Sequence, residues 1–193
     1  DDMGLGKPLQ AISAITQHHQ KFPNTTSLVV CPTSLTYNWK EEINKFNPQL
    51  TTLLIDGTPS QRKKLLNKST EYDVIITSYT LLQKDIDTHK KNTYAYCILD
   101  EAQHIKNRTT RNAKSVKNLQ ALHRLILTGT PIENSLDELW SLFDFLMPGL
   151  LSSYERFVEK YVRNSAFTDS LKQLQKKVAP FILRRMKEDV LDD

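Results

Sequence analysis

Short apolar runs alternate with helical patterns along this sequence, and that alternation restricts the fold more than any other feature. Strands inside a parallel sheet are apolar on both faces, and we expect such strands at residues 27–31, 51–55, 73–79, 96–99 and 124–128. Between them, apolar residues at helical spacing predict helices at about residues 7–20 and 35–46. Basic helices are expected at about residues 60–68, where a solvated basic face is the favoured interpretation, and at about residues 110–121. This order implies an α/β fold with right-handed crossovers and helices on both faces of a parallel sheet.

The pattern changes after residue 147. An amphipathic helix expected over residues 136–146 stops at Pro148 and Gly149. Helical patterns alone follow, at about residues 154–163 and 168–178, before a short strand-like run at residues 181–183. We therefore expect a sheet domain over residues 1–147 and a helical extension over residues 148–193.

Two adjacent carboxylates, Asp100 and Glu101, come directly after the apolar strand at residues 96–99. Ligands of open α/β sheets bind just beyond the carboxyl ends of the strands, so these side chains would lie at a binding edge. Adjacent carboxylates repel each other unless a cation or a proton is shared between them. We interpret Asp100 as a ligand of Mg²⁺, directly or through water, and Glu101 as the group that orients or deprotonates a water. Alone, such a pair also fits a solvated turn.

A second signal lies at the start of the chain, where Gly4, Gly6 and Lys7 fit a phosphate-binding loop. The glycines would let backbone N–H groups approach phosphate oxygens, and the helix that follows would direct its positive N-terminal end towards them. Lys7 would supply a charge to the β- and γ-phosphates. A glycine-rich turn could have the same sequence for structural reasons, but the carboxylate pair downstream favours nucleotide binding.

The bulk composition is that of a globular protein, with 39% hydrophobic and 25% charged residues. The net charge of +4 favours a polyanionic partner. Cys31 and Cys97 both fall in expected buried strands, with no spacing typical of a metal site or a disulfide framework, which points to a reducing compartment. No apolar run approaches the length of a membrane span, and no signal-peptide pattern opens the chain, so we expect a soluble, intracellular protein.

Seven ordered groups of residues resemble the first RecA-like lobe of Swi/Snf-type ATPases, a family of superfamily-two, helicase-like DNA translocases. The resemblance covers essentially the whole chain. The groups are Met3-Gly4-Leu5-Gly6-Lys7, Pro32-Thr33-Ser34-Leu35 with Asn38-Trp39, Ser78-Tyr79, Asp100-Glu101-Ala102-Gln103 with Ile105-Lys106-Asn107, Leu127-Thr128-Gly129-Thr130-Pro131 with Asn134, Leu139-Trp140-Ser141-Leu142, and Leu183-Arg184-Arg185 with Lys187.

The resemblance implies a P-loop NTPase fold and a motor that uses ATP and Mg²⁺ to track along double-stranded DNA. Nucleosomes, RNA polymerase or other DNA-bound complexes would be its targets, and a second RecA-like lobe would complete it. The phosphate loop would comprise Met3, Gly4, Leu5, Gly6, Lys7 and Pro8. Lys7, Asp100 and Glu101 would act on ATP, Mg²⁺ and water as described above, and Thr128 and Thr130 would couple hydrolysis to lobe movement. Thr33, Ser34 and Lys106 would face nucleic acid, although a helix cap and a solvated lysine explain them equally well.

Three features depart from the family pattern. Gln103 stands where the family more often has His, and Pro8 stands where a Ser or Thr would bind Mg²⁺. The sequence also begins inside the phosphate loop, without the upstream adenine-contacting segment or the second lobe with its arginine fingers. We therefore expect a piece of a longer protein that turns over ATP poorly by itself.

Two other functions fit parts of this pattern. Pro8 could have disabled the motor, which would leave a non-catalytic nucleotide- or DNA-binding interaction module. A strand-separating helicase or a restriction-type translocase would share the same lobe, but the motifs after Asn134 favour the Swi/Snf type.

Overall fold

The computed structural model describes residues 6–129 and 135–184 of the chain, without the side chains of Gly6, Lys7, Val178, Leu183 and Arg184. Met3, Gly4, Leu5 and Thr130, which the sequence placed in the candidate site, lie outside the described residues.

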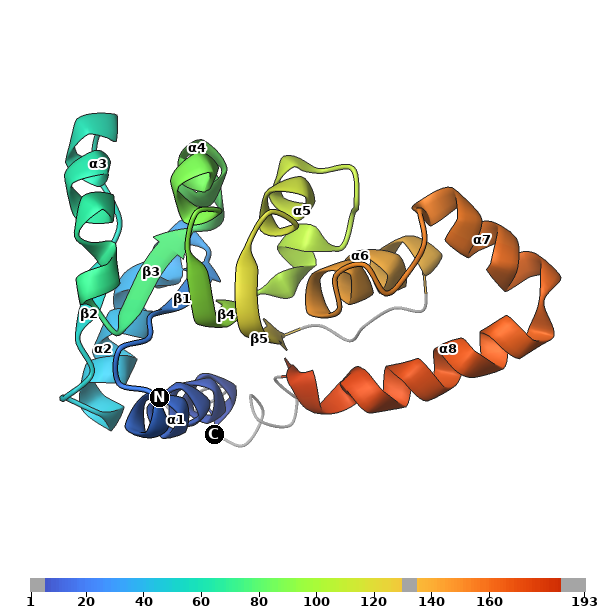
Figure 1. The fold of residues 1–193 in the computed structure, drawn as a ribbon, viewed down its shortest axis with the longest axis horizontal. Coiled ribbons are helices and arrows are strands. Elements are labelled where there is room, and N and C mark those ends of the chain that lie inside the picture. Colours follow the sequence, from blue (N-terminus) through green and yellow to red (C-terminus); the bar gives the residue numbers. More distant parts are fainter. Residues whose placement is uncertain (1–5, 130–134, 185–193) are drawn as a thin grey trace.

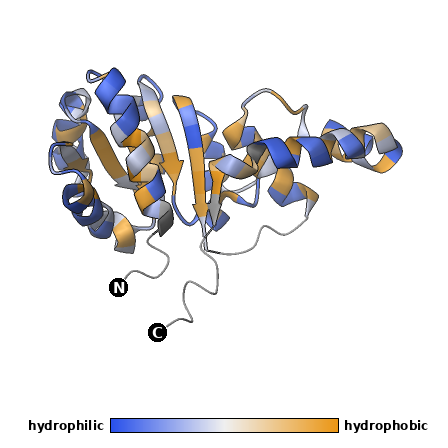
Figure 2. Cartoon of the chain, turned by 90° about the horizontal axis from the view of Figure 1, so that it is seen from below, coloured by the Kyte–Doolittle hydropathy of each residue, from blue (hydrophilic) through white to orange (hydrophobic). Residues whose placement is uncertain are grey.

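A six-stranded sheet forms the centre of the molecule, with the order β2-β3-β1-β4-β5-β6. Every neighbouring pair is parallel, which confirms the predicted sheet type. The strands are largely hydrophobic in Figure 2, as expected for a parallel sheet covered on both faces. The strands are β1 (Ser27–Cys31), β2 (Thr52–Leu54), β3 (Val74–Ser78), β4 (Thr93–Leu99), β5 (Gln120–Thr128) and β6 (Ile182–Arg184).

Helices cover both faces of the sheet (Figure 1). On one face, α1 (Gly6–Lys21) and α2 (Thr36–Phe46) bury Ile12, Trp39 and Ile43 against the strands. On the other face, α3 (Pro59–Asn67), α4 (Tyr79–His89) and α5 (Arg111–Val116) share a second core with the strands. Four short 3₁₀ helices complete the connections: η1 (Thr33–Leu35), η2 (Ser69–Glu71), η3 (Ala102–Ile105) and η4 (Ala179–Phe181).

The C-terminal helices form a third core beside the sheet (Figure 1). They are α6 (Leu136–Leu146), α7 (Tyr154–Arg163) and α8 (Ser165–Val178), and they pack around Trp140, Phe143 and Phe157. After α8 the chain returns to the sheet as β6, close to the short strand expected at residues 181–183. None of the described helices is long and apolar enough to cross a membrane.

Three of the predicted boundaries were wrong. The helix expected over residues 110–121 ends at Val116, because the N–H groups of Asn118 and Leu119 bond back to Ser115 and Val116 in a turn. Strand β5 then begins at Gln120, four residues before its expected start, because Gln120 pairs with Thr93 of β4. Helix α8 begins at Ser165 rather than near residue 168, because the side chain of Asn164 caps it.

Candidate nucleotide-binding site

Most of the candidate site residues that the structure describes lie at the carboxyl edge of the sheet. Strands β1, β4 and β5 are consecutive neighbours and run in the same direction, so their carboxyl ends meet at one edge. Asp100 and Glu101 follow β4, Thr128 is the last residue of β5, and η1 with Thr33 follows β1. The sequence expectation that these positions share one edge is therefore met for Asp100, Glu101 and Thr128.

The N-terminus of α1 reaches the same edge. Near the other end of α1, the His18 ring lies 5.5 Å from His123 in β5 and 5.8 Å from Tyr96 in β4. From His18 back to Gly6 the helix rises about 18 Å, and from His123 to Thr128 the strand advances about 17 Å. Because α1 packs along these strands through Ile12 and Ile15, its first turn lies about level with the end of β5.

Pro8 is the third residue of α1, and its side chain is buried. The first four N–H groups of a helix have no partner within the helix, so a proline there costs no helical hydrogen bond. The helix therefore accepts Pro8 in its first turn. The backbone of Lys7 lies in the same turn.

Asp100 is 1% exposed and is held from both faces of the sheet. From α2, the indole N–H of Trp39 donates to Asp100 Oδ2 at 2.8 Å. From the start of α4, the hydroxyl of Tyr79 donates to the Asp100 carbonyl at 2.7 Å. The backbone N–H of Glu101 donates to Asp100 Oδ1 at 2.8 Å. The position of this carboxylate is therefore fixed by residues far away in the sequence.

Glu101 has a left-handed backbone conformation, with φ 52° and ψ 57°. Outside glycine this conformation is uncommon and costs of order 1–2 kcal/mol, and such strain gathers at functional sites. Glu101 Oε2 accepts a hydrogen bond of 2.7 Å from Gln103 Nε2. The same oxygen would lie 3.8 Å from a Cβ added at Gly129, so the Glu101 carboxylate faces the end of β5.

Burial and the neighbouring Asp100 charge keep the hydroxyl of Tyr79 and the thiol of Cys31 protonated. Burial makes the larger contribution and the Asp100 charge the next, and together they raise the pKa of Tyr79 well above its usual value. The same two causes, in the same order, raise the pKa of Cys31. Tyr79 therefore remains a hydrogen-bond donor, and Cys31 remains a neutral thiol rather than a nucleophile.

The oxygen ligands available at the carboxyl edge of the sheet suit Mg²⁺. This ion binds through one or two carboxylates together with phosphate oxygens and waters, rather than within an all-protein cage. Asp100 supplies a carboxylate beside the N-terminus of α1, where backbone N–H groups favour phosphate. Across the described parts of the chain, no group of three or more His, Cys, Asp or Glu side chains could hold a metal ion by itself.

The three candidate nucleic-acid-side residues are exposed at the same edge. Thr33 and Ser34 lie in η1, directly after β1, and Lys106 follows η3. No side-chain cap is formed at η1, and the N-cap residue of α2 is Leu35, so neither Thr33 nor Ser34 caps α2. Thr33 instead accepts through its carbonyl a bond of 2.9 Å from the Thr36 hydroxyl.

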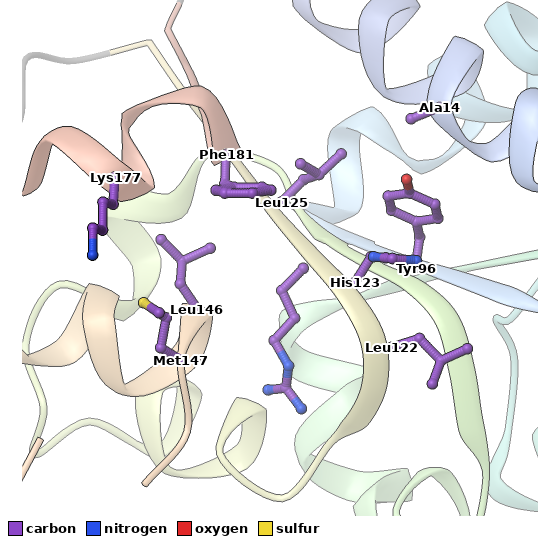
Figure 3. Close-up of a pocket in the computed structure, with 10 residues that line it drawn as sticks. Ala14, Tyr96, Leu122, His123, Leu125, Leu146, Met147, Lys177 and Phe181 are labelled. Carbon is purple, nitrogen blue, oxygen red and sulfur yellow. The ribbon is translucent and has the colours of Figure 1, made fainter. Parts of the chain in front are cut away.

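A separate cavity of about 390 Å³ lies over the amino half of β5 (Figure 3). Its lining includes the apolar side chains of Leu122, Leu125 and Phe181 and the polar side chains of His123 and Lys177. None of its lining residues belongs to the candidate site.

Comparison with known proteins decides the family. A sequence profile of the SNF2-related domain matches residues 1–193. The chain belongs to the SNF2-related family. Over its whole length it is 42% identical to the TATA-binding protein-associated factor mot1 of Schizosaccharomyces pombe, of which it spans 11%. It is 38% identical to an uncharacterized ATP-dependent helicase of Mycoplasma pneumoniae, of which it spans 19%.

The fold of this SNF2-related chain also matches a solved structure. The Sulfolobus solfataricus SWI2/SNF2 ATPase core in complex with double-stranded DNA aligns with all of the chain, at a TM-score of 0.79 and 41% identity, and the chain covers 41% of that core. The predicted RecA-like lobe of the Swi/Snf type is thereby confirmed. The chain spans only a small part of the curated relatives it matches.

Sequence reasoning missed the role of two residues at this edge, Trp39 and Tyr79. Trp39 was interpreted as a residue of the buried helix face, and Tyr79 as the end of a strand. Both also belong to the motifs that resemble the family, which was the available signal. Their bonds to Asp100 connect positions 61 and 21 residues apart, which a sequence pattern does not reveal.

Proposed function

We propose that this chain is the ATP-binding lobe of a DNA-dependent ATPase that moves along double-stranded DNA and remodels or displaces DNA-bound protein complexes. One observation carries the proposal. Asp100, whose carboxylate is buried, and Glu101, whose backbone is strained, follow β4, and the Glu101 carboxylate faces the end of β5, which is about level with the first turn of α1. This is the arrangement that phosphoryl-transfer chemistry needs, since it combines phosphate binding, a metal ligand and a base.

The roles of the individual residues follow from their chemistry. The first turn of α1 and Lys7 would bind the phosphates, with Met3, Gly4, Leu5, Gly6 and Pro8 forming the loop. Asp100 would hold Mg²⁺, whose charge offsets that of the phosphates when it is bound. Glu101 would orient the attacking water and accept its proton. Thr128, the last residue of β5, and Thr130 would couple hydrolysis to lobe movement.

We infer double-stranded DNA as the main partner, contacted through Thr33, Ser34 and Lys106. Two observations support this: these residues are exposed beside the nucleotide edge, and the matched archaeal ATPase core was solved with double-stranded DNA. Factors associated with TATA-binding protein are among the relatives, which favours a DNA-bound protein complex as the target. Nucleosomes and RNA polymerase are further targets to test. A second RecA-like lobe would close the site, and we propose residues 1–147 and 148–193 as sheet lobe and helical extension.

The test is ATP hydrolysis by the full-length protein with and without double-stranded DNA, together with a strand-displacement assay. We expect double-stranded DNA to stimulate hydrolysis by at least about tenfold, or 1.4 kcal/mol in barrier, without strand separation. A rate of ATP hydrolysis that does not change when DNA is added would refute the DNA-dependent motor. Strand separation would instead indicate a helicase or a restriction-type translocase.

Pro8 supports a second candidate, a catalytically impaired nucleotide- or DNA-binding module. Pro8 occupies the first turn of α1, where it offers neither an N–H group to phosphate nor a hydroxyl to Mg²⁺. If the full-length protein binds nucleotide and DNA but hydrolyses no ATP, this second function is the correct one.

A further inference from the structure

We infer that Trp39 is a positioning residue that holds the Asp100 carboxylate and links it to the exposed nucleic-acid side of the lobe. The inference rests on the proposed function of this edge. Trp39 is 3% exposed and donates its indole N–H to Asp100 Oδ2 at 2.8 Å, inside the protein. A bond between a donor and an ionised acceptor is among the stronger hydrogen bonds in proteins.

The covalent path from Trp39 to the nucleic-acid side is short and rigid. Thr33 and Ser34 lie in η1, and α2 begins at Thr36. The backbone N–H and the hydroxyl of Thr36 both donate to the Thr33 carbonyl, so η1 and α2 are joined without a flexible linker. Trp39 is the fourth residue of α2. A displacement of η1 by a bound phosphate backbone would therefore move the indole that holds Asp100.

Two further contacts of Asp100 are on its main chain or come from its direct neighbour. Tyr79 binds the carbonyl of Asp100, and Glu101 donates its backbone N–H to Oδ1. Trp39 is thus the side chain, among the contacts described above, that connects the Asp100 carboxylate to a segment exposed at the nucleic-acid side. This makes Trp39 the natural route by which DNA binding alters the site of Mg²⁺ and ATP.

The test compares two matched substitutions in the full-length protein, Trp39→Phe and Trp140→Phe. Trp140 is the other tryptophan of this sequence and is also buried, and its indole N–H donates to the Ser152 carbonyl at 2.9 Å, within the third core. Both changes remove one indole and one hydrogen bond, but only Trp39→Phe changes the surroundings of Asp100. Thermal melting checks that both variants fold.

Two measurements distinguish a positioning role of Trp39 from a general contribution of Trp39 to the stability of the fold. The first is nucleotide binding by calorimetry across a Mg²⁺ titration, which needs no turnover. The second is the ratio of ATP hydrolysis with and without double-stranded DNA. For Trp39→Phe we expect the half-saturating Mg²⁺ concentration to rise about tenfold and the DNA stimulation to fall about tenfold. The affinity for DNA should stay within about twofold, because Trp39 is buried.

Several results would overturn the inference. Trp39→Phe could leave both readouts within twofold of the wild type, or Trp140→Phe could change them by the same factors. If Trp39→Phe needs more Mg²⁺ to bind nucleotide but is stimulated by DNA as strongly as the wild type, the link between Trp39 and η1 is disproved. If the wild type itself shows no DNA stimulation, the proposed function fails, and the Mg²⁺ titration still decides whether Trp39 positions Asp100.

A second variant keeps the test decisive if phenylalanine disturbs packing. β-(3-Benzothienyl)alanine at position 39 keeps the bicyclic shape of indole and replaces only its N–H group by sulfur. It should reproduce both effects of Trp39→Phe. Wild-type behaviour of this variant would show that the hydrogen bond has no positioning role.

Discussion

Glu101 combines an unfavourable backbone conformation with a defined side-chain contact. Its φ of 52° is left-handed, and its carboxylate has a different partner from that of Asp100: Trp39 donates to Asp100, and Gln103 donates to Glu101. The Gln103 amide then holds the Glu101 carboxylate near the end of β5. The strain is explained if Glu101 must face a water while Asp100 faces a metal ion.

Replacing Glu101 by glutamine tests this division of roles. Glu101→Gln keeps the size of the side chain but removes its basicity, so we expect ATP hydrolysis by the full-length protein to fall by about a hundredfold or more. Nucleotide affinity should stay within about threefold, because Glu101 is not a phosphate ligand. Steady-state hydrolysis and titration with a fluorescent nucleotide measure the two quantities. Glu155→Gln, on the exposed side of α7, is the control, and more than half of the wild-type activity in Glu101→Gln would contradict the assignment.

His89 should make the stability of the chain depend on pH. It is fully buried and bonded through Nδ1 to the Tyr94 hydroxyl at 2.7 Å, and burial lowers its pKa from the usual 6.5 to about 4. Between these two values the unfolded chain binds more protons than the folded one, so stability is lost as the pH falls. The loss due to His89 is about 2 kcal/mol between pH 7.5 and pH 5.

Urea unfolding at pH 7.5 and pH 5 checks this prediction. His89→Gln can still bond to Tyr94 but does not titrate, so its stability should fall less than that of the wild type on acidification. The exposed His104 provides the control variant, His104→Gln, which should follow the wild type. Equal pH dependence of the wild type and His89→Gln would refute the account.

At the scale of secondary-structure elements, a buried ion pair joins helices α3 and α4. Arg62 in α3 donates through Nε to both carboxylate oxygens of Asp85 in α4, at 2.9 and 3.2 Å, and through Nη1 to the Gly57 carbonyl. Its side chain is 6% exposed. The sequence favoured a solvated basic face for this helix, and that holds for Lys63, Lys64 and Lys68 but not for Arg62.

Removing Arg62 leaves the Asp85 carboxylate buried without its cation. We therefore expect Arg62→Ala to lower the free energy of unfolding by about 3–5 kcal/mol. Lys63→Ala, on the exposed side of the same helix, should change it by less than about 0.5 kcal/mol. Urea unfolding measures both values, and similar losses in the two variants would show that the ion pair contributes little.

Helix α1 has a proline in its first turn, which is the turn that should bind phosphate. Pro8→Thr would restore an N–H group and a hydroxyl without altering the helix start, and a hydrogen bond to a charged group is worth about 1.5–3 kcal/mol. We expect the variant to bind Mg²⁺-ATP about ten- to a hundredfold more tightly than the wild type. Calorimetric titration of the full-length proteins measures this. Equal affinities would mean that the phosphate loop takes its donors from other positions.

The elements that were predicted well are those specified by local patterns. Strand β4 and its final carboxylates follow from an apolar run that ends at Asp100, and the topology follows from strands that alternate with helices. The end of α5 and the start of β5 were missed because pairing with β4 overrides the helical pattern of residues 117–121. Trp39 and Arg62 were missed because their partners come from distant segments.

At the scale of the whole molecule, one edge of the sheet collects side chains from segments up to about a hundred residues apart. Parallel strands with right-handed crossovers bring all their carboxyl ends to one edge. This brings together the start of α1, η1, Asp100, Glu101 and Thr128. The helical extension lies to one side, beyond β5 (Figure 1).

A structure of the full-length protein with Mg²⁺ and a non-hydrolysable ATP analogue tests the central claim most directly. We predict the phosphates at the first turn of α1, the metal ion within direct or water-mediated reach of Asp100, and a water beside Glu101. A nucleotide bound in the cavity over β5 (Figure 3), or anywhere other than the carboxyl edge, would contradict the account.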